Sequence, residues 1–399
     1  MQNLKSYFPF FTRNPDINYL DSAATSQALN SVIEDQRNFD LYCRANAHRS
    51  GHKMGASADQ QYHAAKQSIS RWLDVDDPEN SIVFTSGTTQ ALYDAVAMIQ
   101  REFSRATIYV GADSHHSLYI PLRMLAFNTS FFKVKIIDLD SSGRLDLVKL
   151  EEELAKNKEP KIIACTAVSN VLGVINDLER IKELAKTYSC TTILDASQII
   201  SKRKFDLIGF DFVAWSWHKI YGPTGLGCLY LGSRWRKSEP VRPGGGSVNQ
   251  VGYDNIVWQT TAGRFESGTQ NLSAIAAIPK LVEWLIANSI EIEQHDRQLA
   301  NLANQHVPLS MFKPVSETET GLICLEPLHG AVEDYGLMLD AKNIMVRTGK
   351  LCAEPLVSRL TANKSLIRIS WAAYTQRQDI ESAFDMLGQI HERLCRTVR

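Results

Sequence analysis

The alternation of strand-like and helix-like segments along the first two-thirds of the chain limits the possible folds most strongly. Short apolar runs of strand length occur at residues 82–86, 108–111, 131–138, 161–166, 191–195, 212–216 and 227–231. Stretches with helical spacing lie between them at residues 90–100, 117–128 and 178–188. Because such alternation is typical of parallel sheets covered by helices, we predict an α/β fold.

The pattern changes after about residue 270. A long helix is expected over residues 271–306, with Pro279 as a possible kink. Short strands are expected at residues 322–325, 344–347 and 366–371, followed by a final helix from about residue 377. We therefore predict a large domain over residues 16–275. A smaller α+β domain would comprise residues 1–15 and 276–399.

The composition argues against several classes of protein. The 43 lysines and arginines are balanced by 44 acidic residues, so we expect no binding to nucleic acid or to a membrane surface. We find no stretch close to the roughly 18 apolar residues that span a bilayer, and no signal-peptide core. The seven cysteines are odd in number and lack C-x-x-C spacing. We predict no metal site, no disulfide framework and a cytoplasmic location.

Lys219 stands out from the other lysines by its surroundings. It lies in the segment SWHKIYGPTG (216–225), directly after an expected strand, and its neighbours are aromatic or apolar. A lysine removed from solvent loses its proton more easily and can form a Schiff base with a carbonyl group. For an isolated lysine, an ordinary solvated surface charge would be the alternative.

Asp195 comes at the end of the expected strand 191–195, and ligands of parallel sheets gather at the carboxyl ends of strands. A carboxylate there can pair with the nitrogen of a pyridinium ring and help that ring to accept electrons. Gln198 could contact a phenolic oxygen on the same ring. A helix cap or a turn aspartate is the alternative for Asp195.

Gly87-Thr88-Thr89 follows another expected strand and precedes a helix, so its N–H groups and hydroxyls suit a phosphate. A plain helix N-cap fits the spacing about equally well. His115 and His116 follow the strand that ends near Gly111, where a histidine could stack on a flat ring or be a polar loop residue. Together these residues predict a site for pyridoxal 5'-phosphate (PLP).

Ten motifs then carry a family resemblance from the beginning of the chain almost to its end. They are YLDSAAT (19–25), NAHRSGH (46–52), TSGTTQAL (85–92), SHH (114–116), SNVLG (169–173), LDASQ (194–198), SWHKIYGPTG (216–225), ESGTQN (266–271), RTGKLCAEPL (347–356) and RISWAAY (368–374). The sequence resembles the cysteine desulfurases of the class V aminotransferase family, and among them the SufS/CsdA-type branch. This resemblance implies PLP fold type I, with a mostly parallel seven-stranded sheet covered by helices and a smaller α+β domain.

The resemblance also implies roles for individual residues. Lys219 would hold the cofactor and act in catalysis, Asp195 would pair with the ring nitrogen, and Gln198 would contact the phenolic oxygen. His115 would stack on the ring and act in catalysis. The phosphate would be bound by Thr88, Thr89, Ser216 and His218, and by Thr269 from the partner subunit of a homodimer.

The substrate residues follow from the same resemblance. Arg368 would hold the carboxylate of the substrate in a bidentate fork, and Asn170 would orient the substrate. Cys352 would accept sulfur from L-cysteine as a persulfide, leaving L-alanine. Its loop contains Lys350 and lies near Arg347, and cations favour a thiolate.

Three positions depart from the usual pattern of the family. Ser114, Trp217 and Leu351 stand where a glutamate, a small residue and a histidine are often found. The short loop around Cys352 resembles the branch that passes sulfur to a small acceptor protein, so we expect a SufE-like partner.

Two alternatives are kept. One is a selenocysteine lyase or cysteine sulfinate desulfinase, because those substrates have better leaving groups. The other is a non-catalytic scaffold of a sulfur-relay complex, against which the presence of Lys219, Asp195 and Arg368 argues. A dinucleotide-dependent dehydrogenase is excluded by the lack of a G-x-G-x-x-G motif between a first strand and helix.

Overall fold

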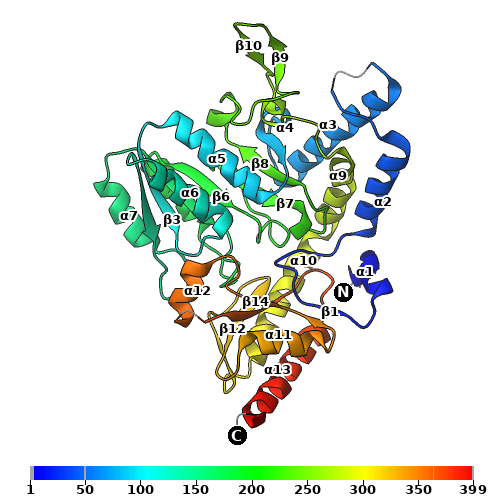
Figure 1. Ribbon diagram of the computed structural model, residues 1–399, viewed down its shortest axis with the longest axis vertical. Helices are drawn as coiled ribbons and strands as arrows, with labels where there is room; N and C mark the ends of the chain where they lie inside the picture. Colours follow the sequence, from blue (N-terminus) through cyan, green and yellow to red (C-terminus); the bar gives the residue numbers. More distant parts are fainter. Residues whose placement is uncertain (1–3, 49–50, 363, 398–399) are drawn as a thin grey trace.

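A seven-stranded sheet forms the centre of the protein (Figure 1). The computed structural model describes residues 4–48, 51–362 and 364–397. In spatial order the strands are β2 (Ile82–Thr85), β8 (Gly227–Leu231), β7 (Phe212–Ser216), β6 (Thr191–Asp195), β5 (Lys161–Thr166), β3 (Ala106–Gly111) and β4 (Phe132–Ile137). Only β8 runs against its neighbours among these strands. The predicted α/β fold with a mostly parallel seven-stranded sheet is therefore confirmed.

Both faces of this sheet are buried except along the edge strand β4, where Lys133, Lys135 and Ile136 are exposed. Burial of the other strands explains their nearly continuous apolar runs. Successive side chains of a strand point to opposite faces. Accordingly, Ile162 belongs to one hydrophobic cluster and Ile163 to the other. Helices α5 (Thr88–Glu102) and α6 (His116–Asn128) supply residues to the first cluster, and α3 (Lys53–Leu73), α7 (Leu147–Lys156) and α8 (Leu178–Thr187) to the second.

The direction of the strands brings the predicted cofactor residues to one edge of the sheet. Strands β2, β3, β6 and β7 all run the same way, because β8 is antiparallel to both β2 and β7. The beginnings of α5 and α6, Asp195, and the turn that follows β7 therefore lie at the carboxyl edge. In α/β sheets this is the edge at which ligands bind.

A second sheet of four antiparallel strands lies in the other part of the molecule, shown in yellow to red in Figure 1. Its order is β11 (Phe312–Pro314), β12 (Leu322–Pro327), β15 (Leu366–Ser370) and β14 (Arg347–Gly349). Helices α11 (Val332–Asp340) and α13 (Arg377–Thr397) pack with it, and α12 (Glu354–Thr361) follows the Cys352 loop. The domain boundary near residue 275 stays a prediction.

The expected long helix over residues 271–306 is in fact two helices, α9 (Leu272–Ala276) and α10 (Ile278–His306). Pro279 lies in the first turn of α10, so the predicted kink takes the form of a break at Ala277, two residues before the proline. The first turn tolerates proline because its N–H groups have no partner within the helix. The expected strand over residues 344–347 is likewise divided between β13 (Ile344–Met345) and β14.

By length and composition alone, the helical stretch Leu272–His306 could cross a membrane. The expectation that no apolar stretch approaches this length was therefore wrong. Of the 18 residues in its most apolar window, 44% are buried inside the protein. Leu281 and Leu285 pack in the cluster beneath the large sheet, and Leu299 packs in the cluster beneath the smaller sheet. In this structure α10 is therefore a core helix that packs against both parts of the molecule.

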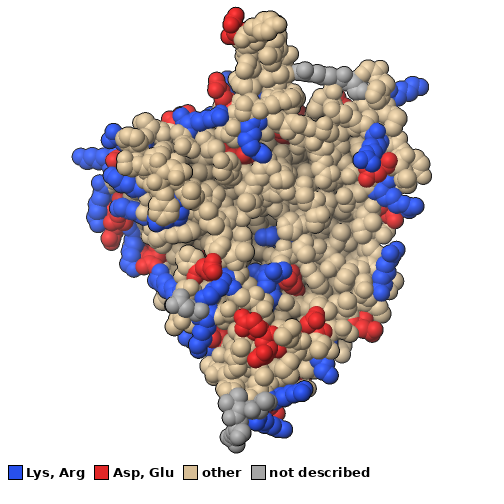
Figure 2. All heavy atoms as spheres, in the orientation of Figure 1, with Lys and Arg blue, Asp and Glu red and all other residues tan. Residues whose placement is uncertain are grey.

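Several elements were not foreseen from the sequence. They are α1 (Pro9–Arg13), β1 (Asn18–Tyr19), α2 (Asn30–Asn38), α3, α4 (Pro78–Ser81), α7, α11, α12 and the hairpin of β9 (Val248–Val251) and β10 (Ile256–Trp258). The hairpin projects from the body of the molecule (Figure 1). On the face seen in Figure 2, acidic and basic side chains are interspersed, and the middle of the face is largely uncharged.

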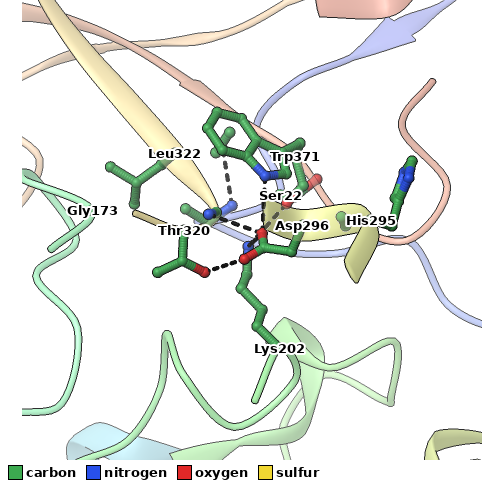
Figure 3. Close-up of polar contacts among 12 residues, drawn as sticks. Ser22, Gly173, Lys202, His295, Asp296, Thr320, Leu322 and Trp371 are labelled. Carbon is green, nitrogen blue, oxygen red and sulfur yellow. Dashed lines mark hydrogen bonds and ion pairs between the residues drawn. The ribbon is translucent and has the colours of Figure 1, made fainter. Parts of the chain in front are cut away.

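A largely buried polar network joins α10 to the segment that follows β6 and to the ends of β12 and β15 in the smaller sheet (Figure 3). Oδ1 of Asp296 accepts hydrogen bonds from the Trp371 indole N–H (2.9 Å) and the Gly321 N–H (3.0 Å), and lies 3.5 Å from Nζ of Lys202. Burial lowers the pKa of Lys202, while Asp296 acts in the opposite direction. Lys202 follows β6 and Trp371 follows β15, so this carboxylate links the segment after Asp195 to the strand that carries Arg368.

Replacing Asp296 is expected to destabilise the protein strongly. The Asp296→Ala change leaves the buried Lys202 ammonium without its counter-charge, which costs about 3–5 kcal/mol of unfolding free energy. Urea unfolding measures this loss. The control is Glu293→Ala, which removes an exposed pair with Arg297 on the same helix and should cost below about 0.5 kcal/mol. A loss below about 1 kcal/mol in Asp296→Ala would contradict the structural role given to the network.

Candidate active site

A cavity of about 530 Å³ opens at the carboxyl edge of the large sheet and brings nearly all the predicted site residues together. Its lining includes Thr88, Thr89, His115, Asn170, Asp195, Gln198, Ser216, His218, Lys219, Cys352 and Arg368. A larger cavity, of about 840 Å³, lies between the loop 139–144, α10 and α12, and contains none of these residues. The chemistry therefore points to the smaller cavity.

Lys219 lies at the end of the short turn Trp217–Lys219 that directly continues β7. Burial lowers the pKa of its ammonium group, and the nearby Arg368 acts in the same direction, while Asp195 opposes them. Asp195 is itself buried at the end of β6, and its Oδ1 accepts a hydrogen bond from the N–H of Ser197 (3.0 Å). The site thus combines a lysine that loses its proton more easily than usual with a buried carboxylate.

A cluster of hydroxyl groups lies at the N-terminus of α5. The Thr88 hydroxyl is 2.7 Å from that of Ser216 and 2.9 Å from that of Ser197. The Thr89 hydroxyl is 2.8 Å from that of Ser117. Hydroxyls at the start of a helix suit an anion such as phosphate, because the helix dipole is positive there.

Both histidines of the cavity are neutral near pH 7. Burial lowers the pKa of His115 to about 4, with Asp195 opposing, and burial together with Lys219 lowers that of His218 to about 4. Nδ1 of His115 accepts a hydrogen bond from the Ser117 N–H (3.1 Å) as it caps α6. The neutral ring of His115 is suited to stack on a flat aromatic group.

These residues fit a flat aromatic phosphate ester. One end of the cavity has the hydroxyl cluster and a helix N-terminus, and the buried Asp195 carboxylate is placed to meet a ring cation. Lys219 supplies an amine for covalent attachment. The Gln198 amide donates to the Ala23 carbonyl (2.9 Å), so its predicted contact to a phenolic oxygen stays a prediction.

The smaller sheet supplies the opposite wall of the cavity. Arg368, on β15, is buried, and its guanidinium donates to the Asn170 carbonyl (3.2 Å) and lies 3.4 Å from Oδ1 of Asp21. Its Nε and the Asn170 Oδ1 are buried without a hydrogen-bond partner among the described residues. Buried polar atoms normally have partners, so these two indicate a polar ligand that remains to be bound.

Cys352 lies on an exposed turn between β14 and α12 and lines the cavity. Leu351 and Cys352 have φ values of 58° and 53°, in the left-handed region. For residues other than glycine this conformation costs about 1–2 kcal/mol each. A strained turn at this position is a common feature of functional sites.

Sequence reasoning assigned no role to Asp21, Ser117 or Ser197. Asp21 forms a bidentate pair with Arg347, with distances of 3.1 Å to Nε and 2.7 Å to Nη2, and also approaches Arg368. The signal was present, since Asp21 belongs to the motif YLDSAAT, and Ser197 belongs to LDASQ. Their roles depend on contacts between distant segments, which the motifs do not reveal.

Thr269 is the one predicted site residue outside this cavity. It lies beside the loop Gly244–Gly246, where the Gly268 N–H donates to the Gly245 carbonyl (2.7 Å). Two residues of the motif NAHRSGH, Arg49 and Ser50, lie outside the described residues.

The three departures from the family pattern are all buried. Ser114 lies just before His115, and its hydroxyl has no partner among the described residues. The Trp217 indole donates to Sγ of Cys228 (3.3 Å) beneath the cavity. Leu351 packs with the cluster that includes Ala353 and Leu356.

Comparison with known proteins agrees with this geometry. The family model described as Aminotransferase class-V matches residues 18–383. A probable cysteine desulfurase from Halalkalibacterium halodurans is 30% identical over 95% of each chain. The cysteine desulfurase from Pectobacterium carotovorum is 30% identical over 94% of this chain and 93% of its own.

Two solved structures extend the comparison to three dimensions. The apo structure of a cysteine desulfurase from Thermococcus onnurineus has a TM-score of 0.90 at 26% identity, covering 99% of this chain and 98% of its own. The cysteine desulfurase CsdA (S-sulfonic acid) from Escherichia coli has a TM-score of 0.88 at 27% identity, covering 98% of each chain. The chain therefore belongs to the class V aminotransferase family, among its PLP-dependent cysteine desulfurases.

Proposed function

We propose that this protein converts L-cysteine to L-alanine and transfers the sulfur to Cys352. The observation that carries the proposal is the single cavity that combines Lys219, the buried guanidinium of Arg368 and the thiol of Cys352. The lysine would bind the cofactor, the arginine would bind the substrate carboxylate, and the exposed thiol would accept sulfur. The experiments with Cys352 and Lys219 variants in the Discussion test this function.

The residues that would hold the cofactor are Lys219, Asp195, His115, Gln198 and the hydroxyl cluster with His218. PLP, when bound, supplies an electron sink for the substrate carbon. Lys219 can take up a proton at Nζ as a general base, since burial lowers its pKa. The Asp195 carboxylate would pair with the ring nitrogen of the cofactor, and His115 would stack on the ring.

Arg368 and Asn170 would position the substrate. The guanidinium of Arg368 binds the substrate carboxylate, for which its free Nε is available. The Asn170 Oδ1 is free to accept a hydrogen bond from the substrate. Asp21 must give way at Arg368 or share it, because the two lie 3.4 Å apart.

The sulfur step balances without an added oxidant. The Cys352 thiolate attacks the sulfur of the substrate, the new S–S bond forms, and the C–S bond of the substrate breaks. The electron pair of the C–S bond stays with the carbon fragment, which takes up a proton and leaves as alanine. The sulfur of the substrate remains on Cys352 as the outer sulfur of a persulfide.

We propose that a small SufE-like protein removes this sulfur. In support, the Cys352 turn joins β14 directly to α12, which leaves little chain for carrying sulfur away from the site. Adding such an acceptor is expected to raise steady-state alanine formation several-fold. The matched control is the acceptor with its sulfur-accepting cysteine changed to serine, and no acceleration by any of several acceptors would count against the partner.

A homodimer and a cytoplasmic location belong to the same proposal, with iron–sulfur cluster assembly as one destination for the sulfur. Thr269 supports the dimer, because it lies outside the cavity of its own chain. From that position it would bind the cofactor phosphate of a neighbouring subunit. The β9–β10 hairpin, with Val251 and Ile256 exposed, also supports a partner surface.

A further inference from the structure

The turn that carries Cys352 is held in its conformation by residues from elsewhere in the chain. The Ala353 N–H donates to the Lys350 carbonyl (3.0 Å), which closes a four-residue turn. Its two central residues, Leu351 and Cys352, both have positive φ, as in type I′ turns, where asparagine and glycine are favoured. Because leucine and cysteine do not favour this geometry, contacts from outside the turn must maintain it.

Two residues provide those contacts. The Asn170 amide donates to the Leu351 carbonyl (2.8 Å). The backbone N–H of His116 donates to the Cys352 carbonyl (2.8 Å). In return, the Glu354 N–H donates to Nε2 of the His116 ring (3.2 Å).

His116 thereby joins two helix N-termini. It is the first residue of α6, and N–H groups in a first turn have no partner within their own helix. The Cys352 carbonyl satisfies this N–H. Glu354 is the first residue of α12, and the N-cap residue of this helix, Ala353, has no side chain that can cap it. The His116 ring caps the helix instead, by accepting the hydrogen bond from the Glu354 N–H.

We propose that His116 is a positioning residue that holds the Cys352 turn against the cavity. The residue before it, His115, lines the same cavity. The N-terminus of α6 therefore positions both the His115 ring and the turn that carries Cys352. Nε2 accepts a hydrogen bond in this arrangement, so the ring proton is on Nδ1. This role rests on the proposed function of Cys352 and concerns the sulfur step, not substrate binding.

The test compares His116→Ala with His116→Gln in the PLP-loaded protein. Alanine removes the acceptor but keeps the backbone N–H, whereas the side-chain oxygen of glutamine can replace Nε2 as acceptor. His116→Ala is expected to slow single-turnover persulfide formation on Cys352 about 10-fold, the order of a lost helix cap, with KM for cysteine unchanged within about twofold. His116→Gln is expected to restore most of the rate.

Glu354→Gln is the matched control. It removes the carboxylate that lies 3.7 Å from Nε2 of His116, but it keeps the backbone donor, so the rate should stay at the wild-type value. A wild-type rate in His116→Ala would overturn the proposal. So would a change confined to KM, or a His116→Gln protein as slow as His116→Ala.

Hydrogen exchange of the peptide 350–356 provides a readout that does not depend on activity. His116→Ala should speed exchange at the Glu354 amide, while His116→Gln should protect it. Unchanged exchange in His116→Ala would contradict the contact, whatever the activity. If the wild-type protein forms no persulfide but exchange responds as expected, the proposed function fails and the positioning contact stands.

Discussion

The Cys352→Ala protein is expected to keep its bound cofactor and lose at least about 10³-fold of its alanine formation from L-cysteine, as expected when a nucleophile is removed. The reason is that no other thiol lines the cavity: Cys165, Cys228 and Cys324 are buried in the core. Burial also raises the pKa of the Cys324 thiol to about 12, which disfavours its thiolate. Alanine and sulfide are measured under reducing conditions, together with the visible spectrum.

Cys395→Ala is the control, since Cys395 is a partly exposed cysteine on α13, outside the cavity, and should react at the wild-type rate. Unchanged turnover of L-cysteine by Cys352→Ala would refute the role of Cys352. Selenocysteine and cysteine sulfinate separate the alternative substrates. If Cys352→Ala retains full activity on either of them while the wild type turns over cysteine slowly, that substrate is the favoured one.

The Lys219→Ala protein is expected to lose both its covalent link to the cofactor and at least about 10³-fold of its activity. Lys219 is the lysine that lines the cavity, and burial lowers its pKa, which favours the neutral amine. Borohydride treatment of the wild-type protein should attach the cofactor to a peptide that contains Lys219. The same treatment should leave the Lys219→Ala protein unlabelled.

Lys204→Ala is the matched control, because Lys204 is exposed and lies outside the cavity. Its labelling and activity should equal those of the wild type. Borohydride labelling of another lysine in the wild-type protein would show that the cofactor attachment has been assigned to the wrong residue.

Most strands of the large sheet were predictable because they are buried on both faces. Strands such as β5 and β6 consist almost wholly of buried residues, so their apolar runs mark their boundaries without any knowledge of partners. Lys219 and Asp195 were found for a related reason, because each lies at the end of such a run. Their neighbours in sequence already indicate a site at the carboxyl edge.

The wall opposite the sheet could not be predicted in the same way. Arg368, Asn170 and Asp21 come from three distant parts of the chain and meet only when the smaller sheet packs on the larger one. The family resemblance supplied roles for Arg368 and Asn170. Local pattern gave no indication of Asp21, and it marked His116 only as a neighbour of His115 that could stack on a ring or be a polar loop residue. Their importance lies in hydrogen bonds to backbone or side-chain atoms far along the sequence, which neither periodicity nor spacing reveals.

The helix 271–306 shows the limit of periodicity itself. Its apolar spacing continues through Ala277, so a single helix was expected. The break comes from Pro279, which lies in the first turn of α10. Proline is found both in first turns and at kinks within helices, and apolar spacing does not distinguish these two cases.

The most direct test of sulfur transfer to Cys352 is the mass of the Cys352 peptide after the PLP-loaded protein has reacted with L-cysteine in the absence of reductant and acceptor. This peptide is expected to gain the mass of one sulfur atom as one equivalent of alanine appears, and alkylation should then trap a persulfide at Cys352. Alanine formation with no added sulfur on Cys352, or with the sulfur on another cysteine, would contradict sulfur transfer to Cys352.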